Sequence, residues 1–294
     1  MVITKLMGGL GNQMFQFAAG KTLATRLNTS FFLDMDFLLD RTPRPNFVYR
    51  DYDLTIFKLK ATRASANQLK PFLYVPENRV ERYFKKLRNA ISPHHYYRET
   101  HFHFDEKFRT LTGNVYMEGY WQSPHYFEEI SEVIRNDFSF SSPIGERSES
   151  LKAQILASSS VCVNVRRSDF LTNSFHGVCD MKYFKPAIER MAAQVKDAHF
   201  FVFSDDPDWC VENFSFRYPF TFVGHDHAGS KFSTYLQLMA SCKHFIIPNS
   251  SFAWWAVWLN RSNEKLVIGP KLWFNDLRWD TRDLIPADWI RIDN

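Results

Sequence analysis

Short apolar runs alternate with segments of mixed polarity along most of this chain. The run VITKLM (residues 2–7) predicts a strand, residues 12–27 predict a helix with apolar and polar faces, and SFFLDMD (residues 30–36) predicts a second strand. A strand, a loop, a helix and a further strand in this order are typical of parallel, doubly wound sheets.

The same alternation continues in the rest of the chain, apart from residues 37–100, which are rich in Pro, Arg and aromatic residues and are harder to assign. Residues 141–150 (SSPIGERSES) have the composition of a linker. We therefore expect an α/β protein of GT-B-like type, with two Rossmann-like domains (1–145 and 146–294) whose open parallel sheets face a cleft. Further strands are expected at 114–121, 161–165, 199–204, 244–248 and 265–268, and further helices at 181–195, 233–242 and 251–260.

Composition narrows the class of protein. A hydrophobic fraction of 45% over 294 residues is enough for a large core and excludes a disordered chain. The net charge of +4 lacks the dense basic character of nucleic-acid binding, so no nucleic-acid partner is expected. The N-terminus lacks a signal-peptide pattern, and the longest strongly apolar run, residues 252–259, is too short to span a membrane, so we expect a soluble protein.

The cysteines indicate a reducing compartment. Four of them lie far apart and never form C-x-x-C, which argues against a disulfide framework or a zinc knuckle. A cytoplasmic location follows as the expectation. These cysteines are Cys162, Cys179, Cys210 and Cys242.

A glycine-rich loop, Gly8 to Gln13, joins the first strand to the first helix. Glycines there allow a ligand to approach the backbone, and a helix N-terminus offers N–H groups to an anion. A merely tight turn explains the loop equally well. Asp34 and Asp36 end the next strand, as in the dinucleotide fingerprint, but Met14 stands where that fingerprint needs its third glycine, which argues against an NAD-dependent oxidoreductase.

Two adjacent arginines follow the strand at 161–165. Arg166 or Arg167 can make charge-assisted hydrogen bonds to a diphosphate. Because neighbouring strand side chains alternate, only one of them easily faces the cleft, and the other would brace the loop through Asp169. A structural salt bridge between Asp169 and an arginine is the simpler alternative.

Carboxylates follow the strand at 199–204. Asp205 and Asp206 stand where open α/β sheets place ligand contacts, and Asp206 and Asp208 form an Asp-x-Asp. These side chains can hold a divalent metal, accept a proton or cap the next helix. Capping by Ser204 or Asp205 is the structural alternative.

A third loop, Pro248 to Ser251, leads into a Trp-rich helix whose start can bind phosphate. Trp254 and Trp258 share one face of that helix and are more typical of a core than of a ligand platform. His176 lies in the loop after the double arginine, where a histidine can act as a general base.

Four motifs together resemble the bacterial α-1,2-fucosyltransferases of glycosyltransferase family 11. They are GGLGNQMFQFA, VRRSD, VFSDDPDWC and LMASCKHFIIPNSSFAWWAVWLN, in that order and over nearly the whole chain. The resemblance implies a GT-B fold, a GDP-β-L-fucose donor, and inverting transfer to the 2-hydroxyl of a galactoside with neither a metal nor another cofactor. An acceptor in an O-antigen-type, lipid-linked precursor is the matching expectation.

The resemblance also implies site residues. Arg166 would contact the donor phosphates and stabilise the leaving group, while the glycine loop would face the diphosphate and acceptor from the other domain. The catalytic residues expected are Arg166, His176 and Asn12. The donor-binding residues expected are Gly9, Gly11, Asn164, Arg166, Arg167, Asp169, Asp205, Asp206, Tyr235, Asn249, Ser250 and Ser251.

The chain departs from the family pattern where the nucleotide base is read. Asn164 replaces a histidine, Ser168 a glycine and Tyr235 an aspartate. Either another nucleotide, such as a dTDP- or UDP-linked sugar, is the donor, or other residues such as Ser233 or Thr234 read the guanine. A catalytically inactive glycan- or nucleotide-binding homologue is the alternative from another class.

A basic, aromatic stretch at residues 81–90 includes Lys85, Lys86 and Arg88. It can form a peripheral contact with anionic lipid, as an enzyme of lipid-linked precursors requires. A solvated helix face explains it equally well.

Overall fold

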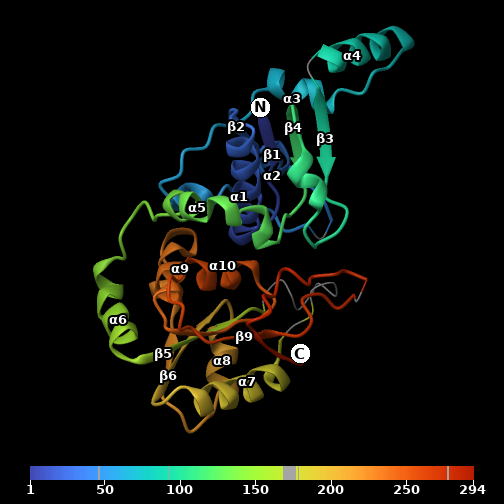
Figure 1. The fold of residues 1–294 in the computed structure, drawn as a ribbon. Helices are drawn as coiled ribbons and strands as arrows, with labels where there is room; N and C mark the ends of the chain where they lie inside the picture. Colours follow the sequence, from blue (N-terminus) through green and yellow to red (C-terminus); the bar gives the residue numbers. More distant parts are fainter. Residues whose placement is uncertain (46, 92, 168–176, 178, 277) are drawn as a thin grey trace. The chain divides into compact units, whose positions relative to one another are not determined.

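The computed structural model describes residues 1–45, 47–91, 93–167, 177, 179–276 and 278–294 (Figure 1). The chain divides into two compact units, Met1–Ser139 and Phe140–Asn294, which we call the N-unit and the C-unit. Each contains one open sheet in which every paired strand is parallel. The predicted α/β class with two parallel sheets is confirmed, and a cleft between the units stays a prediction.

The N-unit sheet has the strand order β2-β1-β4-β3. Its helix α1 connects β1 to β2 and buries Met14, Phe17 and Leu23, as the apolar positions at 12–27 predict. The N-unit strands are β1 (Val2–Lys5), β2 (Phe31–Asp34), β3 (His94–Arg98) and β4 (Asn114–Glu118). The N-unit helices are α1 (Leu10–Arg26), α2 (Asp36–Leu39), α3 (Ala66–Leu73), α4 (Arg79–Ile91), α5 (Ser131–Asp137) and the 3₁₀ turns η1 (Leu54–Ile56), η2 (Glu106–Thr110), η3 (Pro124–Tyr126) and η4 (Glu128–Ile130).

The C-unit sheet has the order β10-β9-β8-β5-β6-β7. Counted within the unit this order is 3-2-1-4-5-6 read from the opposite edge, the Rossmann order, and its reversal lies between β5 and β8. The C-unit strands are β5 (Ser159–Val165), β6 (Ala198–Ser204), β7 (Phe220–Val223), β8 (His244–Ile246), β9 (Val267–Pro270) and β10 (Ile290–Ile292). The C-unit helices are α6 (Glu146–Ala157), α7 (Met181–Gln194), α8 (Pro207–Asn213), α9 (Ser233–Ala240), α10 (Ser251–Leu259) and the 3₁₀ turns η6 (His225–His227) and η7 (Ser230–Phe232).

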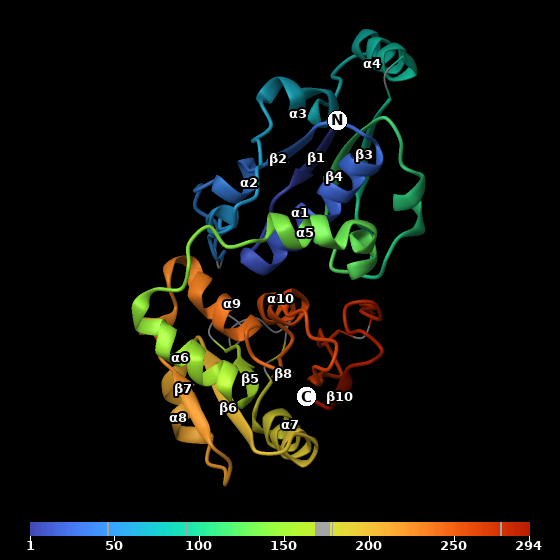
Figure 2. The same cartoon turned by 60° about the vertical axis from the view of Figure 1, so that its left-hand side comes forward.

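The core of the C-unit forms between the sheet and α7 (Figure 2). Val161, Val163 and Val165 of β5 pack in one buried cluster with Tyr183 and Ile188 of α7, because alternate strand residues face the same side. The Tyr183 hydroxyl donates to the Ile247 carbonyl at 2.5 Å, so the polar end of this aromatic side chain is satisfied. This packing fixes the end of β5, where the double arginine follows.

The stretch at 141–150 is only partly a linker. Residues 146–150 already belong to helix α6, and Gly145 is its N-cap with φ −68° and ψ 154°. The prediction of a linker over the whole stretch is therefore wrong. Glutamates at 146 and 149 in the first turn favour the helix through its dipole, which the Ser and Gly content concealed.

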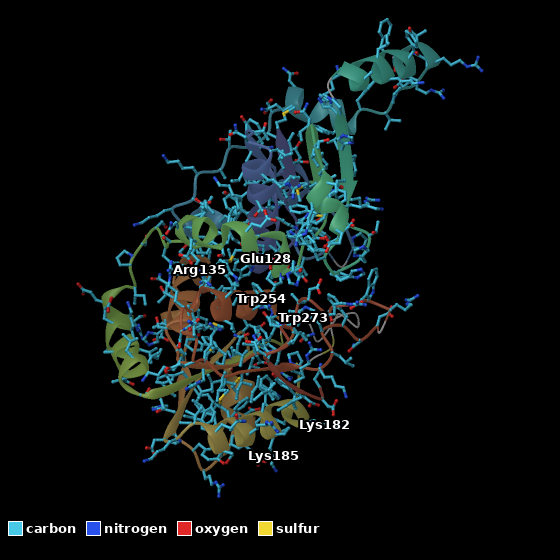
Figure 3. The ribbon with its side chains drawn as sticks, viewed as in Figure 1. Glu128, Arg135, Lys182, Lys185, Trp254 and Trp273 are labelled. Carbon is cyan, nitrogen blue, oxygen red and sulfur yellow. The ribbon has the colours of Figure 1, made fainter. Side chains whose placement is uncertain are left out.

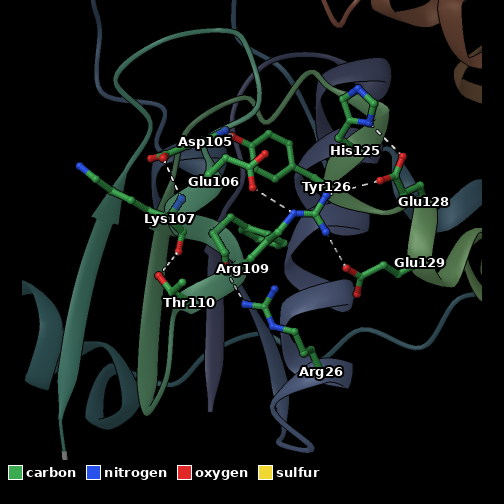
Figure 4. Close-up of polar contacts among 11 residues, drawn as sticks. Arg26, Asp105, Glu106, Lys107, Arg109, Thr110, His125, Tyr126, Glu128 and Glu129 are labelled. Atoms are coloured by element: carbon green, nitrogen blue, oxygen red, sulfur yellow. Dashed lines mark hydrogen bonds and ion pairs between the residues drawn. The ribbon is translucent and has the colours of Figure 1, made fainter.

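An ion-pair network ties together the segments that follow β3 and β4 (Figure 4). Arg109 lies 3.2 Å from Glu106, 3.6 Å from Glu128 and 3.1 Å from Glu129. The backbone N–H of Asp105 donates to the Tyr126 hydroxyl at 3.0 Å. These contacts hold the segment before β4 against the segment that follows it.

All four cysteines are free and buried, in agreement with the prediction of no disulfide framework. Burial raises the pKa of the Cys179 thiol to about 12 and that of the Cys210 thiol to about 11. Among the residues that the structure describes, no helix is both long and apolar enough to span a bilayer.

Candidate functional site

Three strands of the C-unit end at the same edge of the sheet. Val165, the last residue of β5, pairs with Ser204, the last of β6, and Val163 pairs with Ile246, the last of β8. The loops after these strands carry most of the predicted donor-binding residues. The fold therefore brings together side chains from three separate motifs, at and beside the β5–β8 switch point where open α/β sheets bind ligands.

Arg166 is held at this edge by Asp205. Its Nη1 lies 2.8 Å from Asp205 Oδ2, and the side chains are 28% and 12% exposed. The other carboxylate oxygen of Asp205 accepts the backbone N–H of Arg167 at 2.9 Å. One carboxylate thus fixes both the guanidinium and the backbone after β5.

Arg167 braces the loop after β6. Its Nε lies 3.2 Å from Asp206 Oδ2, and its guanidinium stacks 4.0 Å from the centroid of the Trp209 ring. Within the described residues the bracing carboxylate is Asp206. Asp169, which the sequence assigns to this task, lies outside the described residues, as does His176.

Asp206 is also the N-cap of α8. Its carboxylate accepts the backbone N–H of Trp209 at 3.3 Å. The alternative in which Ser204 or Asp205 caps this helix is therefore wrong. Ser204 instead accepts the backbone N–H of Asp206 at 2.9 Å through its hydroxyl, which orders the same turn.

The loop after β8 is fixed by Asn249. Its Nδ2 donates to the Trp273 carbonyl at 3.0 Å and to the Gly177 carbonyl at 3.5 Å. Its Oδ1 accepts the Cys179 thiol at 3.7 Å. This buried amide joins the loops after β5, β8 and β9, which gives it an architectural role in the described structure.

Helix α10 begins directly after this loop, at the carboxyl edge of β8. The Ser250 hydroxyl is its N-cap and accepts the Ala253 N–H at 3.5 Å, and Ser251 is its first residue. A helix N-terminus carries partial positive charge. Trp254 of α10 is buried and donates to the Leu284 carbonyl at 2.7 Å, which confirms a core role; Figure 3 labels it together with Trp273.

Asn164 and Tyr235, the two departures from the family pattern, are both buried. Asn164 Nδ2 donates to the Phe203 carbonyl at 3.2 Å, and the Tyr235 hydroxyl donates to the Val223 carbonyl at 2.7 Å. Burial also raises the pKa of Tyr235, so its hydroxyl stays a donor. His225, which the sequence analysis did not single out, contacts the Ser204 carbonyl through Nε2 at 2.9 Å.

The glycine loop of the N-unit lies at the switch point between β1 and β4. Gly8 has φ +76°, and a Cβ there would lie 2.5 Å from Asn12 Nδ2, so only glycine fits. Gly9 is the N-cap of α1, and a Cβ on it would have no neighbour within 4 Å. Asn12 accepts the Gln122 side-chain amide at 2.8 Å, and Gly11 is buried in the first turn.

Two buried glutamines hold this loop, and the sequence analysis missed both. Gln13 donates to the carbonyls of Gly8 at 2.9 Å and Asp51 at 2.8 Å, and it accepts the Asp53 N–H at 2.9 Å. Gln16 accepts the Met7 N–H at 2.9 Å and donates to the Gly119 carbonyl at 3.1 Å. Polar residues are expected on the solvent face of a helix, and only for Gln16, between Phe15 and Phe17, did the neighbouring residues hint at burial.

Glu99 follows β3 at the same edge and is a further residue that sequence reasoning missed. Its carboxylate accepts the backbone N–H of Tyr120 at 2.6 Å and that of Trp121 at 2.9 Å. Trp121 has φ +57°, so Glu99 stabilises a turn that a bulky residue rarely adopts. Burial raises the pKa of Glu99 to about 7, against the opposing effect of these two hydrogen bonds.

Within the described residues, no three His, Cys, Asp or Glu side chains gather closely enough to hold a metal ion. The acidic residues of the C-unit edge instead pair with arginines, as Asp205 and Asp206 do. This edge thus presents guanidinium groups and a helix N-terminus, both of which suit an anion.

Two full-length relatives are similar to this chain. An alpha-1,2-colitosyltransferase of Escherichia coli is 31% identical over all of this chain and 99% of its own length. The O-antigen biosynthesis glycosyltransferase WbnK of Escherichia coli is 28% identical over 92% of this chain and 93% of its own length. A galactoside alpha-(1,2)-fucosyltransferase 1 of Mus musculus is 28% identical over 56% of this chain and 45% of its own.

Among solved structures, the fucosyltransferase NodZ from Bradyrhizobium aligns over 87% of this chain and 92% of its own, with a TM-score of 0.48 and 16% identity. A structure of POFUT1 in complex with GDP-fucose aligns over 91% of this chain and 97% of its own, with a TM-score of 0.47 and 15% identity.

The model of the Glycosyl transferase family 11 matches residues 60–293, which include the double arginine, the aspartates after β6 and the start of α10. Together with the full-length relative at 31% identity, this match establishes what the four motifs indicate. The chain belongs to glycosyltransferase family 11.

Proposed function

We propose that this glycosyltransferase moves L-fucose from GDP-β-L-fucose to the 2-hydroxyl of a galactoside, with inversion, in an O-antigen-type precursor. The observation that carries the proposal is the pairing of Arg166 with Asp205 at the end of β5, on the same sheet edge as the start of α10. An oriented guanidinium and a helix N-terminus are two groups that can stabilise a departing diphosphate.

The reaction assigns a task to each group. The 2-hydroxyl oxygen attacks C1 of the sugar, the bond from C1 to the diphosphate oxygen breaks, and GDP carries away the electron pair. Arg166, Ser250 and Ser251 stabilise the charge that develops on the diphosphate. Asn12 positions the acceptor from the glycine loop.

The proton of the attacking hydroxyl passes to a general base. His176 and a carboxylate are the two candidates, and Glu99 is the carboxylate that fits best among the described residues. It lies at the carboxyl edge of the N-unit sheet, and its pKa of about 7 suits proton transfer near neutral pH. We assign the N-unit to the acceptor and the C-unit to the nucleotide sugar.

The name of one relative favours colitose as a second candidate for the transferred sugar. The relative that matches this chain over its full length is named a colitosyltransferase. Colitose differs from L-fucose by the absence of the 3-hydroxyl, so a site with room for L-fucose also has room for colitose. A dTDP- or UDP-linked sugar is the further alternative, because Asn164 and Tyr235 replace the family residues.

The first experiment is thermal stabilisation of the purified chain by GDP, UDP, dTDP and CDP at equal concentration, with and without magnesium. Stabilisation by GDP alone, unchanged by magnesium, supports the proposal, and preference for another nucleotide overturns the assigned donor. Transfer assays with GDP-fucose and GDP-colitose on a galactoside then identify the sugar. Stabilisation by a nucleotide without product from any donor would mean a binding protein that has lost activity.

The acceptor and the site of action belong to the same proposal. We place the reaction in the cytoplasm, on a galactose-containing, lipid-linked glycan at the inner face of the membrane. The relative WbnK is an O-antigen biosynthesis glycosyltransferase by name, which supports this class of acceptor. Product formation on a lipid-linked acceptor, compared with the free oligosaccharide, tests it.

A further inference from the structure

Helix α4 of the N-unit carries an apolar face that is open to solvent. Val80 and Phe84 are each 63% exposed, Tyr83 is 61% exposed and Leu87 is 44% exposed. These four residues, which we call the α4 face, stand at positions i, i+3, i+4 and i+7, so they form a single stripe along the helix. In both Figure 1 and Figure 2 the helix projects beyond the N-unit sheet.

The helix is locally well defined despite its exposure. Asn78 stands before its first residue and accepts the Glu81 N–H at 2.9 Å through its side chain, as an N-cap does. The Glu81 carboxylate accepts from the Glu77 N–H at 2.9 Å and from Asn78 Nδ2 at 3.1 Å, and it also bonds to the Tyr74 hydroxyl. The apolar stripe therefore belongs to a capped helix, anchored to the segment before it.

The remaining helix surface is strongly basic. The sequence RVERYFKKLRNAI contains five basic residues, and its single acidic residue, Glu81, bonds with neighbours at the helix start. At roughly 100° per residue the apolar positions fall within an arc of about 100°, with Arg79 and Lys86 beside it. Cations beside an apolar and aromatic stripe are typical of helices that lie in the interface of an anionic membrane.

We propose that the α4 face docks the N-unit onto an anionic lipid bilayer, with Phe84 and Leu87 entering the headgroup region. The positive charge of the helix favours an anionic bilayer over a second copy of the chain. A second copy of the chain would bring a second basic helix against the first, at a cost in electrostatic repulsion, whereas anionic headgroups neutralise the flanking cations. The docking surface requires neither donor nor acceptor, so it stands apart from the proposed transfer reaction.

Flotation with lipid vesicles, without any sugar nucleotide, tests the proposal. The full chain is expected to float with vesicles of phosphatidylcholine and 30% phosphatidylglycerol, and to float at least ten times less with phosphatidylcholine alone. Phe84→Glu and Leu87→Glu are expected to reduce flotation about tenfold. The matched control is Leu156→Glu, which changes a leucine that is 55% exposed on α6 and should leave flotation unchanged.

Three outcomes would overturn the proposal. The first is no flotation of the wild-type chain, and the second is equal flotation of wild type and Phe84→Glu. The third is a dimer, seen by light scattering, that Phe84→Glu dissociates while vesicle binding is absent. Circular dichroism and the thermal midpoint of each variant show whether lost binding comes from lost structure.

Discussion

Asp205 holds Arg166 through an ion pair of 2.8 Å, although the two residues follow different strands and lie 39 positions apart in sequence. The parallel register of β5 and β6 alone makes this pair possible, because it places both strand ends at one edge. A guanidinium oriented in this way loses little further conformational freedom when it binds a phosphate.

Arg166→Ala is expected to lower kcat by about 10²- to 10³-fold, because it removes charge stabilisation of the leaving diphosphate. Transfer from GDP-fucose, followed by release of GDP, measures the effect. Arg147→Ala is the matched control, since Arg147 is an exposed arginine of the same unit that pairs with Asp226. Turnover like that of the wild type in Arg166→Ala would show that this arginine has no part in the reaction.

Gly9→Ala separates ligand contact from folding in the glycine loop. A Cβ at Gly9 has no neighbour within 4 Å, so we expect unchanged stability but at least a tenfold rise in KM if a ligand approaches this backbone. The comparison is Gly8→Ala, where the positive φ and the contact with Asn12 should destabilise the N-unit by about 1–3 kcal/mol. Urea unfolding and steady-state kinetics provide the two readouts, and an unaffected KM for Gly9→Ala would leave the loop as a tight turn.

Glu99 should give the enzyme a pH dependence near neutrality. If Glu99 is the general base, kcat/KM rises with pH through about 7. Glu99→Gln should then lower kcat/KM by about 10²- to 10⁴-fold and abolish this rise. Glu106→Gln, a change at an exposed glutamate of the same unit, is the control. A normal pH profile in Glu99→Gln would restrict Glu99 to bracing the Trp121 turn.

The raised pKa of Glu99 also predicts that the free energy of unfolding depends on pH. Its pKa is about 7 in the folded chain and about 4.5 when unfolded, so folding favours the protonated form. The contribution of Glu99 to the free energy of unfolding is fully present below about pH 4.5 and is lost as the pH rises to about 7. Urea unfolding at pH 4.5, 6 and 8 should show this decline in the wild type and not in Glu99→Gln.

Tyr235→Phe tests whether the hydroxyl reads the nucleotide. Because that hydroxyl donates to the buried Val223 carbonyl, we expect a loss of about 0.5–1.5 kcal/mol in stability and less than a threefold change in the Kd of GDP. Isothermal calorimetry and chemical unfolding measure the two quantities. A tenfold weaker Kd with intact stability would instead assign the hydroxyl to guanine.

The sequence predicted the central strands well because their residues are buried on both faces. VCVNV and HFFVFS are mainly apolar runs, and the structure extends the first by two residues and the second by one at its start. The sequence pattern did not predict β3, whose residues are HHYYR. β3 is an edge strand in which three of the five residues are exposed, so no apolar run marks it.

For the site, the sequence identified the loops but not their contacts. Strand-end positions were sufficient to single out Arg166, Asp205 and Ser250. The stacking of Arg167 on Trp209 and the bonds of Gln13 depend on register and on loop conformation, which no local pattern encodes. Glu99 escaped notice because its importance arises from burial beside backbone N–H groups that lie more than twenty residues away.

All four buried cysteines belong to the C-unit, and the N-unit sequence contains none. Thiol reagents therefore react with the native chain only when the C-unit opens, since all four thiols are buried in the folded state. The rate of thiol labelling thus reports the opening of the C-unit by itself. If the C-unit holds the nucleotide, as we propose, a bound nucleotide should slow this labelling without any introduced probe.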